Sequence, residues 1–441
     1  MGLSPGLGSA RSRPLISART IALDLLQSVF DRLRPLDEAI ERHDGWRRLD
    51  SRDRAFARAL AATTLRRVGQ IDRVIDQCLN QPLPARAGAI RQLLRLGVCQ
   101  LLYLETPAHA AVDATVGMLD GRGGEAGFKG LVNAVLRRTD REREELLKIA
   151  ADLSINVPPW LWQTWVGSYG AETAERIVAA HLLEPPLDIS VKHNIDEWAR
   201  TLGAIRLPTG SLRRNNAGPI EELPGFAAGE WWVQDAAAAL PARLLGDVVG
   251  KSVIDLCAAP GGKTAQLAAA GAIVMAVDRS PARLRRLAEN LTRLKLGAEI
   301  IEADGLTWQP AAPADAVLID APCSSTGTIR RNPDIAWLKR PEDIAKQASL
   351  QDRLLSAAIA MVRSGGVIVY CTCSLQPAEG IERIDLLLKS DAPVERMPIT
   401  AAEVGDQPEF ISANGDLRTM PYHLGELGGL DGFYAARLRR C

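Results

Sequence analysis

Apolar residues recur at helical spacing through the first third of the chain. Residues 18–29, for example, place Ala18, Ile21, Leu25 and Val29 three or four positions apart, which is the period of one face of an α-helix. Similar runs, separated by prolines, continue as far as residue 148, and no alternating strand pattern of useful length interrupts them. The pattern predicts an all-helical domain over 15–148.

The last part of the chain, residues 231–441, has a different pattern. Short continuous apolar runs, of the kind found in strands buried on both faces, alternate there with helical stretches at 281–296 and 347–362. Strands separated by helices are typical of a doubly wound, Rossmann-like α/β domain built on a parallel sheet. The expected strands are residues 252–256, 273–277, 299–301, 316–319 and 367–370.

Residues 151–230, between these two parts, mix helical and strand patterns. Pro158 and Pro159 mark the start of a new unit, and two further prolines precede an apolar run at 187–191 that predicts a strand. A helical pattern follows at 195–202. We expect a small α+β module that works as an adaptor, so the whole chain is predicted to be a multidomain protein.

Composition narrows the class of protein. The 441 residues are 47% hydrophobic and 24% charged, which excludes intrinsic disorder as a description of the whole chain. No run reaches the roughly 18 uncharged apolar residues of a membrane helix, and residues 1–9 lack the features of a secretory signal. Seven cysteines, an odd number, do not make a disulfide scaffold. We therefore expect a cytoplasmic protein with no membrane contact, and we expect it to be a monomer.

The formal net charge of zero hides an uneven distribution. Residues 1–150 hold 24 Lys and Arg against 18 Asp and Glu, and residues 45–100 hold eleven arginines against four aspartates. A local basic excess of this kind favours a polyanionic partner. An arginine-rich helical face exposed to solvent explains the same charge pattern without any partner.

The strongest local signal is a strand that ends in a glycine-rich turn and leads into a helix, over residues 253–264. In such a turn the backbone N–H groups approach a ligand closely. The sequence of this turn matches neither G-x-G-x-x-G nor the Walker A sequence, so a phosphate-binding loop is disfavoured. Asp278 and Asp304 follow the next two strands, where a carboxylate accepts hydrogen bonds from ribose hydroxyls or an adenine amine. The expected ligand therefore contains an adenosine but no pyrophosphate, and this favours S-adenosylmethionine over NAD as the cofactor. The expected cofactor contacts are Cys257, Ala258, Ala259, Pro260, Gly261, Gly262, Lys263, Asp278, Asp304 and Asp320.

Three motifs in this region resemble those of the Sun/Fmu family of RNA cytosine-5 methyltransferases. Residues 255–264 are similar to the first motif of the family, residues 320–327 (DAPCSSTG) to the fourth and residues 370–374 (YCTCS) to the sixth. The likeness extends from about Gln234 to Leu438. The helical N-terminal part resembles the NusB-like RNA-binding domain that accompanies family members acting on small-subunit ribosomal RNA.

The resemblance implies transfer of a methyl group from S-adenosylmethionine to carbon 5 of one cytosine in small-subunit (16S) ribosomal RNA. Carbon 5 is a poor nucleophile until a thiolate adds to carbon 6 and turns the ring into an enamine, so covalent catalysis suits the reaction. In the family the Thr-Cys cysteine, here Cys373, attacks, and the Pro-Cys cysteine, here Cys323, assists product release. The reverse assignment stays open. Asp320 is expected to hydrogen-bond or protonate N3 of the base and to lie near the methionine part of the cofactor.

Other functions remain open from the sequence alone. The chain could be an RNA-binding or ribosome-assembly factor with a methyltransferase fold, or it could act on another RNA, such as tRNA. Methylation of an exocyclic amine is disfavoured because Cys323 stands where such enzymes carry an aromatic residue. A zinc site at Cys323, Cys371 and Cys373 is also disfavoured, because the Cys-x-Cys spacing is too short and no histidine is near in sequence. We expect no metal.

Arginines are the candidate RNA contacts, because a cytosine must be unpaired or flipped to reach Cys373 and the remaining RNA is held through its shape and phosphates. One group follows the proposed fourth motif, beside the active-site loop, and the other lies in the helical domain. The candidates are Arg330, Arg331 and Asn332 in the first group, and Arg47, Arg48, Arg52, Arg54, Arg66 and Arg67 in the second.

One position departs from the family pattern. After the Thr-Cys motif the family often has an acidic residue followed by Asn, whereas here Glu379 is followed by Gly380. The two cysteines are unaffected, so we expect a change in local positioning and not in the type of reaction.

Overall fold

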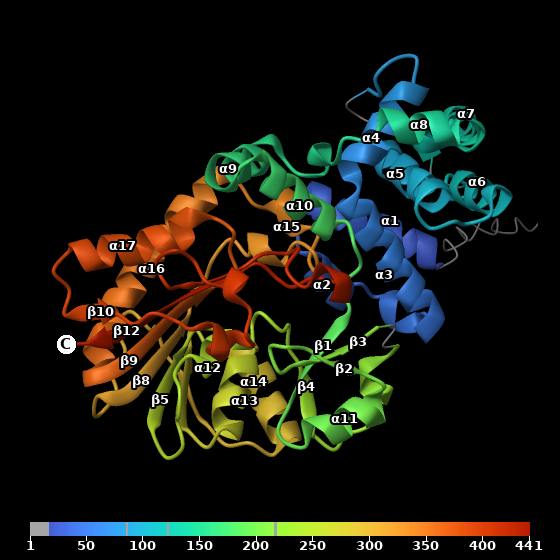
Figure 1. Ribbon diagram of the computed structural model, residues 1–441. Coiled ribbons are helices and arrows are strands. Elements are labelled where there is room, and N and C mark those ends of the chain that lie inside the picture. The colour runs from blue at the N-terminus through green and yellow to red at the C-terminus, as the bar shows by residue number, and fades with distance from the viewer. Residues whose placement is uncertain (1–16, 85–86, 121–122, 216–217) are drawn as a thin grey trace, which may run out of the picture. The chain divides into compact units, whose positions relative to one another are not determined.

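The computed structural model describes residues 17–84, 87–120, 123–215 and 218–441. The chain forms two compact units, one ending at Asn156 and the other running from Val157 to Cys441 (Figure 1). Residues 1–16, where the expected domain begins, lie outside the described residues. Among the described residues, no helix is both long enough and apolar enough to cross a membrane.

The N-terminal unit is helical, as predicted. Side-chain caps fix two of its helix starts: the Ser17 hydroxyl accepts from Thr20 N, and the Asp50 carboxylate accepts from Asp53 N at 2.7 Å. Gly97 lets two helices approach closely, because a Cβ there would lie 2.6 Å from the Leu136 side chain. The helices are α1 (Ala18–Arg32), α2 (Leu36–Glu41), α3 (Ser51–Arg66), α4 (Val68–Cys78), α5 (Gly88–Leu102), α6 (Ala108–Gly117), α7 (Lys129–Arg141) and α8 (Arg143–Ile149).

The second unit opens with a small mixed region. Its antiparallel sheet has the order β2-β3-β1-β4. A buried ion pair joins β1 to β3, since Arg213 donates to both carboxylate oxygens of Asp188 at 2.6 and 2.7 Å. This region contains α9 (Pro159–Tyr169), α10 (Ala171–His181), β1 (Leu187–Val191), α11 (Ile195–Leu202), β2 (Ile205–Arg206), β3 (Leu212–Arg214) and β4 (Trp231–Val233). The strand at 187–191 and the helix at 195–202 have their predicted bounds.

A large sheet of eight strands forms the centre of the second unit, with the order β10-β12-β9-β8-β5-β6-β7 and β11 paired to β12. The five strands from β9 to β7 are parallel, as predicted. The sheet also contains an antiparallel part that the apolar runs did not indicate, because β12 runs antiparallel to β9, β10 and β11. The strands are β5 (Ser252–Leu256), β6 (Ile273–Asp278), β7 (Glu299–Glu302), β8 (Ala314–Asp320), β9 (Val362–Thr372), β10 (Val394–Arg396), β11 (Leu417–Thr419) and β12 (Phe433–Arg440).

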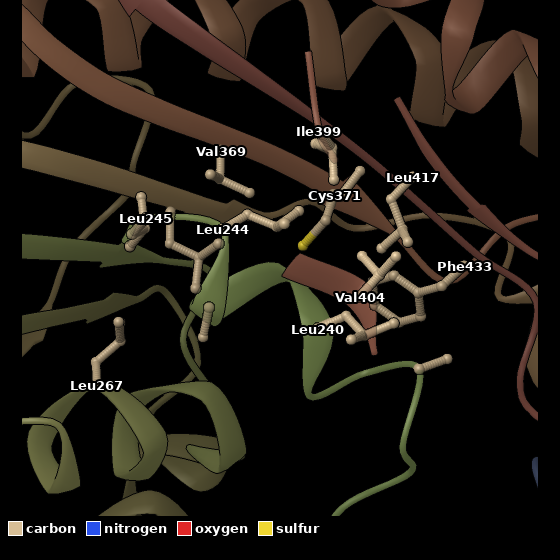
Figure 2. Packing of buried hydrophobic residues seen from close by; sticks show 14 of the residues in the cluster. Leu240, Leu244, Leu245, Leu267, Val369, Cys371, Ile399, Val404, Leu417 and Phe433 are labelled. Carbon is tan, nitrogen blue, oxygen red and sulfur yellow. The ribbon is translucent and has the colours of Figure 1, made fainter. Parts of the chain in front are cut away.

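Helices cover both faces of this sheet, which explains why its strands are apolar throughout (Figure 1). Alternate residues of β8 enter different cores: Leu318 packs with residues of α12 and α13, whereas Ile319 packs with residues of α16. Figure 2 shows the first of these cores, with Cys371 among leucines and Phe433. The helices are α12 (Leu240–Arg243), α13 (Gly262–Ala269), α14 (Pro281–Leu294), α15 (Ile335–Leu338), α16 (Pro341–Met361) and α17 (Ile381–Lys389).

The strand order places a topological switch point between β5 and β8. From β5 the chain continues to β6 and β7 on one side and then returns to β8 and β9 on the other. In open α/β sheets, ligands bind outside the carboxyl ends of the strands at such a point. The turn after β5 and the residues after β8 therefore border the expected site.

Candidate functional site

The turn after β5 has an unusual backbone that brings its N–H groups to the end of the sheet. Cys257 adopts a left-handed conformation (φ 62°), and the N–H of Ala258 bonds to the carbonyl of Val277 on β6. Gly261 has φ 101°, and a Cβ there would lie 2.7 Å from the Leu287 side chain. Only glycine suits that position, which directly precedes helix α13 and so places the free N–H groups of its first turn next to the end of β5.

Two aspartates lie at or just after the carboxyl ends of β6 and β7, the strands next to β5 on one side of the sheet. Asp278, at the end of β6, is buried and accepts hydrogen bonds from Ala259 N at 3.2 Å and Ser280 N at 2.9 Å. The exposed Arg283 also donates to its carboxylate. Asp304, which follows β7, is exposed and accepts from Leu306 N. Both carboxylates lie at the carboxyl ends of neighbouring strands, where an adenosine would need acceptors for its ribose hydroxyls and its amine.

Lys263 and Asp320 form an ion pair across the switch point. Lys263 Nζ, in the first turn of α13, lies 2.8 Å from Asp320 Oδ2 at the end of β8. Burial alone lowers the pKa of Lys263, but the nearby Asp320 carboxylate outweighs it, and the net pKa is raised. The thiol of Cys371, the parallel-ladder partner of Asp320, donates to the other carboxylate oxygen at 3.6 Å. Asp320 is thus held on two sides, and its side chain is still 32% exposed.

The two motif cysteines meet at the same edge of the sheet. Cys323 Sγ and Cys373 Sγ lie 3.5 Å apart, although 50 residues separate them in sequence. Backbone hydrogen bonds hold the two segments together: Ala321 N donates to Cys371 O, and Gly327 N donates to Cys373 O. Both sulfurs follow strands that pair directly, β8 and β9.

The surroundings of the two thiols differ, and so do their pKa values. The pKa of Cys373 is lowered, chiefly because the Cys323 thiol donates a hydrogen bond to it, with further contributions from Ser325 and Lys263. The pKa of Cys323 is raised well above its usual value by the hydrogen bond to Cys373, by burial and by the negative charge of Glu379. The opposite directions of the two shifts favour Cys373 over Cys323 as the thiolate of the pair.

Sequence reasoning noted Glu379 only as part of a motif and did not expect its contacts. The carboxylate is buried and accepts three hydrogen bonds, from Ser324 N at 2.8 Å, Ser324 Oγ at 2.5 Å and Ser374 Oγ at 2.6 Å. It therefore connects the residue after Cys323 to the residue after Cys373. Gly380 suits its surroundings, because a Cβ there would lie 3.0 Å from both Arg418 and the Tyr434 ring.

Arg330, one of the candidate RNA contacts, is buried in the structure. Its side chain is only 1% exposed. The guanidinium donates to the buried carboxylate of Asp235 at 2.8 Å and to Gly428 O at 2.7 Å. Arg331 pairs with the buried Asp431, yet its side chain is 40% exposed. Sequence could not reveal these partners, since each carboxylate lies about 100 residues from its arginine.

The other candidate RNA contacts differ in how free their side chains are. Asn332 is half-buried and donates to Thr328 Oγ1 at 3.1 Å. In the N-terminal unit, Arg67 lies over the Tyr103 ring at 4.5 Å and also donates to Gln70, so its guanidinium is already engaged. Arg66 and Arg54 are half-buried, and Arg54 donates to Leu49 O. Exposed side chains, which suit a phosphate contact, are those of Arg47, Arg48 and Arg52.

The residues of the site suit S-adenosylmethionine. In the described part of the chain, no group of three or more His, Cys, Asp or Glu side chains is placed to hold a metal ion. The turn after β5 offers N–H donors for a carboxylate, Asp278 and Asp304 offer acceptors for a nucleoside, and the Asp320 carboxylate offers a negative charge near a sulfonium.

Comparisons with known proteins agree with this site. The model of the 16S rRNA methyltransferase RsmB/F family matches residues 242–439, and the model of the NusB family matches residues 16–141. The ribosomal RNA small subunit methyltransferase B of Serratia proteamaculans is 39% identical over 362 residues, which are 78% of this chain and 84% of that protein. Its namesake from Pseudomonas putida is 38% identical over 411 residues, which are 89% of this chain and 91% of that protein.

A solved structure shows the same fold over nearly the whole chain. The crystal structure of PH0851 covers 97% of this chain and 100% of its own, with a TM-score of 0.74 and 23% sequence identity. At that identity the likeness concerns the fold alone.

The fold and the residues at its switch point define an S-adenosylmethionine-dependent methyltransferase. The relatives named above share more than a third of their residues with this chain over most of both sequences. The chain belongs to the RsmB/F family of 16S rRNA methyltransferases and carries a NusB-family domain. The family, fold class and cofactor expected from the sequence are thereby confirmed.

Proposed function

We propose that this chain methylates carbon 5 of a cytosine in 16S ribosomal RNA and that Cys373 is its nucleophile. The observation that carries the proposal is the pair of thiols 3.5 Å apart at the carboxyl edge of the sheet, next to the Lys263–Asp320 pair. The names of its relatives favour ribosomal RNA of the small subunit over tRNA. A binding or assembly factor would not need two adjacent thiols with different protonation.

The first step is addition of the Cys373 thiolate to carbon 6 of the cytosine. The sulfur supplies the electron pair of the new bond, and the electrons of the C5=C6 bond move toward N3, which gains a proton or a hydrogen bond. Asp320 is placed to meet that nitrogen, because its side chain is partly exposed and is held by Lys263 and Cys371. In its carboxylic-acid form it would donate the hydrogen bond or the proton to N3. Bound S-adenosylmethionine supplies the methyl group that carbon 5 then attacks.

The second step releases the product. Water takes the proton of carbon 5, and the electrons of that C–H bond form the C5=C6 double bond again. The bond between Cys373 Sγ and carbon 6 breaks with its electron pair on the sulfur, and N3 gives up the proton that it gained. Cys323 is placed to take part, since its sulfur lies within hydrogen-bond distance of the Cys373 sulfur. Attack by one thiol and assistance by the other explain why both are present.

RNA binding is proposed to involve the N-terminal unit and the edge of the active site. Arg47, Arg48 and Arg52 are exposed and lie within the most basic part of the chain, whereas Arg331 is exposed close to the active-site loop. Phosphate contacts of this kind position RNA without reading its sequence. The proposed substrate also favours a cytoplasmic location, and we propose that the chain acts as a monomer.

Incubation of purified 16S rRNA with the protein and S-adenosylmethionine, followed by nucleoside analysis, tests this function. We expect 5-methylcytidine from the wild type and from Cys441→Ser, a control at an exposed cysteine. Cys373→Ser is expected to form none, because a hydroxyl is a far weaker nucleophile than a thiolate. Methylation of tRNA alone, or of an exocyclic amine, would contradict the proposal.

A further inference from the structure

The carboxylate of Glu379 connects the two cysteine segments at their closest point. One of its oxygens accepts from Ser324 N at 2.8 Å, and the other accepts from the hydroxyls of Ser324 and Ser374 at 2.5 and 2.6 Å. Ser324 directly follows Cys323, and Ser374 directly follows Cys373. These hydrogen bonds fix the distance between the two segments, and therefore between the sulfurs.

Glu379 is itself held rigidly. It ends a short 3-10 helix, Pro377–Glu379, and its backbone carbonyl accepts hydrogen bonds from the Tyr370 hydroxyl at 2.9 Å and from Thr372 Oγ1 at 3.2 Å. Both donors are on β9, the strand that leads to Cys373. The side chain is fully buried, so water does not compete for these contacts.

The charges around the two sulfurs are unequal. The hydrogen bond to Cys373 and burial contribute most to the raised pKa of Cys323, and the negative charge of Glu379 raises it further. For Cys373, the hydrogen bonds from Cys323 and Ser325 and the charge of Lys263 lower the pKa, whereas burial and the charge of Asp320 raise it. Burial raises the pKa of Glu379, and the hydrogen bonds from Ser324 and Ser374, together with the charge of Lys339, offset this only in part. A carboxylate behind Cys323 therefore makes ionisation of that sulfur unfavourable.

We propose that Glu379 is a positioning residue that holds the two cysteine segments together and keeps the shared proton on Cys323, so that Cys373 attacks. The inference rests on the proposed function, since it assigns roles within the same site. It adds a reason why one of two adjacent thiols is the nucleophile. Glu379 itself touches neither the substrate nor the reacting carbon atoms.

The variant Glu379→Gln tests the negative charge of Glu379 separately from its hydrogen bonds. The amide keeps the size of the carboxylate, its oxygen can accept from Ser324 N, and its NH₂ group can donate to the two serine hydroxyls once these rotate. The negative charge is removed. Glu379→Ala removes the charge and the hydrogen bonds together, and Glu382→Gln removes a charge from a nearby exposed side chain as a control.

The test measures how fast iodoacetamide alkylates Cys323 and Cys373 in the folded protein as a function of pH, with each site read by mass spectrometry. In Glu379→Gln we expect alkylation of Cys323 at pH 7.5 to rise roughly tenfold, the size expected when one nearby charge is removed. The ratio of Cys373 to Cys323 labelling should fall, whereas Glu382→Gln should match the wild type.

Turnover gives a second readout. Glu379→Gln is expected to lower kcat with little change in KM for RNA, and Glu379→Asp should restore part of the labelling ratio. Unchanged labelling in Glu379→Gln would overturn the proposal, even if activity fell. Because alkylation needs no RNA, the result stands apart from the proposed function: a chain that makes no 5-methylcytidine but shows the shifted labelling contradicts that function alone.

Discussion

Lys263 Nζ lies 2.8 Å from Asp320 Oδ2 and so connects the helix after the glycine-rich turn to the end of the neighbouring strand. The pair crosses the switch point of the sheet, between the proposed cofactor site and the proposed catalytic site. Lys263 is buried, while Asp320 is partly exposed and can turn toward a substrate. The same contact therefore stabilises the fold and orients a functional carboxylate.

Lys263→Met should destabilise the second unit and weaken cofactor binding. Loss of one partner from a buried pair costs about 3–5 kcal/mol, and the partial exposure of Asp320 reduces this to about 1–3 kcal/mol. Urea unfolding measures the change, and calorimetry with S-adenosylhomocysteine measures the affinity. Lys389→Met, at an exposed position at the end of α17, is the control. Equal stability of both variants would contradict the importance of the pair.

Asp278→Asn should weaken cofactor binding without preventing folding. The carboxylate is placed to accept the ribose hydroxyls, and hydrogen bonds to a charged group are worth about 1.5–3 kcal/mol, so the affinity should fall about 10–100-fold. Calorimetric titration with S-adenosylhomocysteine measures this change. Glu289→Gln, on the exposed side of α14, should keep the wild-type affinity. A shift of less than twofold in Asp278→Asn would argue against a ribose contact.

Arg330→Ala should lower stability because it leaves Asp235 with less positive charge nearby. Both side chains are fully buried, and removal of one partner from such a pair costs about 3–5 kcal/mol. The free energy of unfolding, measured in urea, should fall by that amount, whereas Arg363→Ala should lose less than about 1 kcal/mol because Arg363 is exposed. If Arg330→Ala is as stable as the wild type but binds RNA poorly, Arg330 contacts RNA, as the sequence led us to expect.

The buried His181 predicts a loss of stability in acid. Its ring packs against Trp165, and neither ring nitrogen has a hydrogen-bond partner among the described residues. Burial, with a smaller contribution from Arg330, lowers the pKa of His181 to about 3. The unfolded chain takes up a proton below pH 6.5 and the folded chain does not, so this stability is complete above pH 6.5 and is lost as the pH falls toward 3.

His181→Phe isolates that contribution. Between pH 7 and pH 5 the wild type should lose about 2 kcal/mol more of its free energy of unfolding than the variant does. Other groups with shifted pKa values, such as His423, act equally in both proteins and cancel in the difference. Parallel pH profiles for the two proteins would show that the His181 ring is protonated in the folded state.

Local patterns in the sequence predicted much of the fold. The strand at 252–256 and the helix at 195–202 have their predicted bounds, since both depend on the spacing of their own apolar residues. The helix predicted at 347–362 begins earlier, at Pro341, because an Asp343 carboxylate caps the polar first turn by accepting from Arg340 N. The antiparallel strand β12 was missed, because strand direction depends on a partner far away in sequence.

The candidate site, like the fold, could be predicted from the sequence only in part. The family resemblance implied that Cys323 and Cys373 act on the same base, and the two sulfurs do lie 3.5 Å apart. The burial of Arg330 and the contacts of Glu379 were not predicted, since both depend on partners that lie far away in sequence. A buried Glu next to two serine-containing motifs is the signal that would have indicated the second of these.

The most direct test of the account is a covalent adduct. Cys323→Ala, incubated with 16S rRNA and S-adenosylmethionine, should accumulate a protein–RNA complex that survives a denaturing gel, because Cys373 still attacks while release is blocked. The complex should be missing from Cys323→Ala/Cys373→Ala. An adduct that persists in this double variant, or methylation by it, would contradict the assignment of Cys373 as the nucleophile.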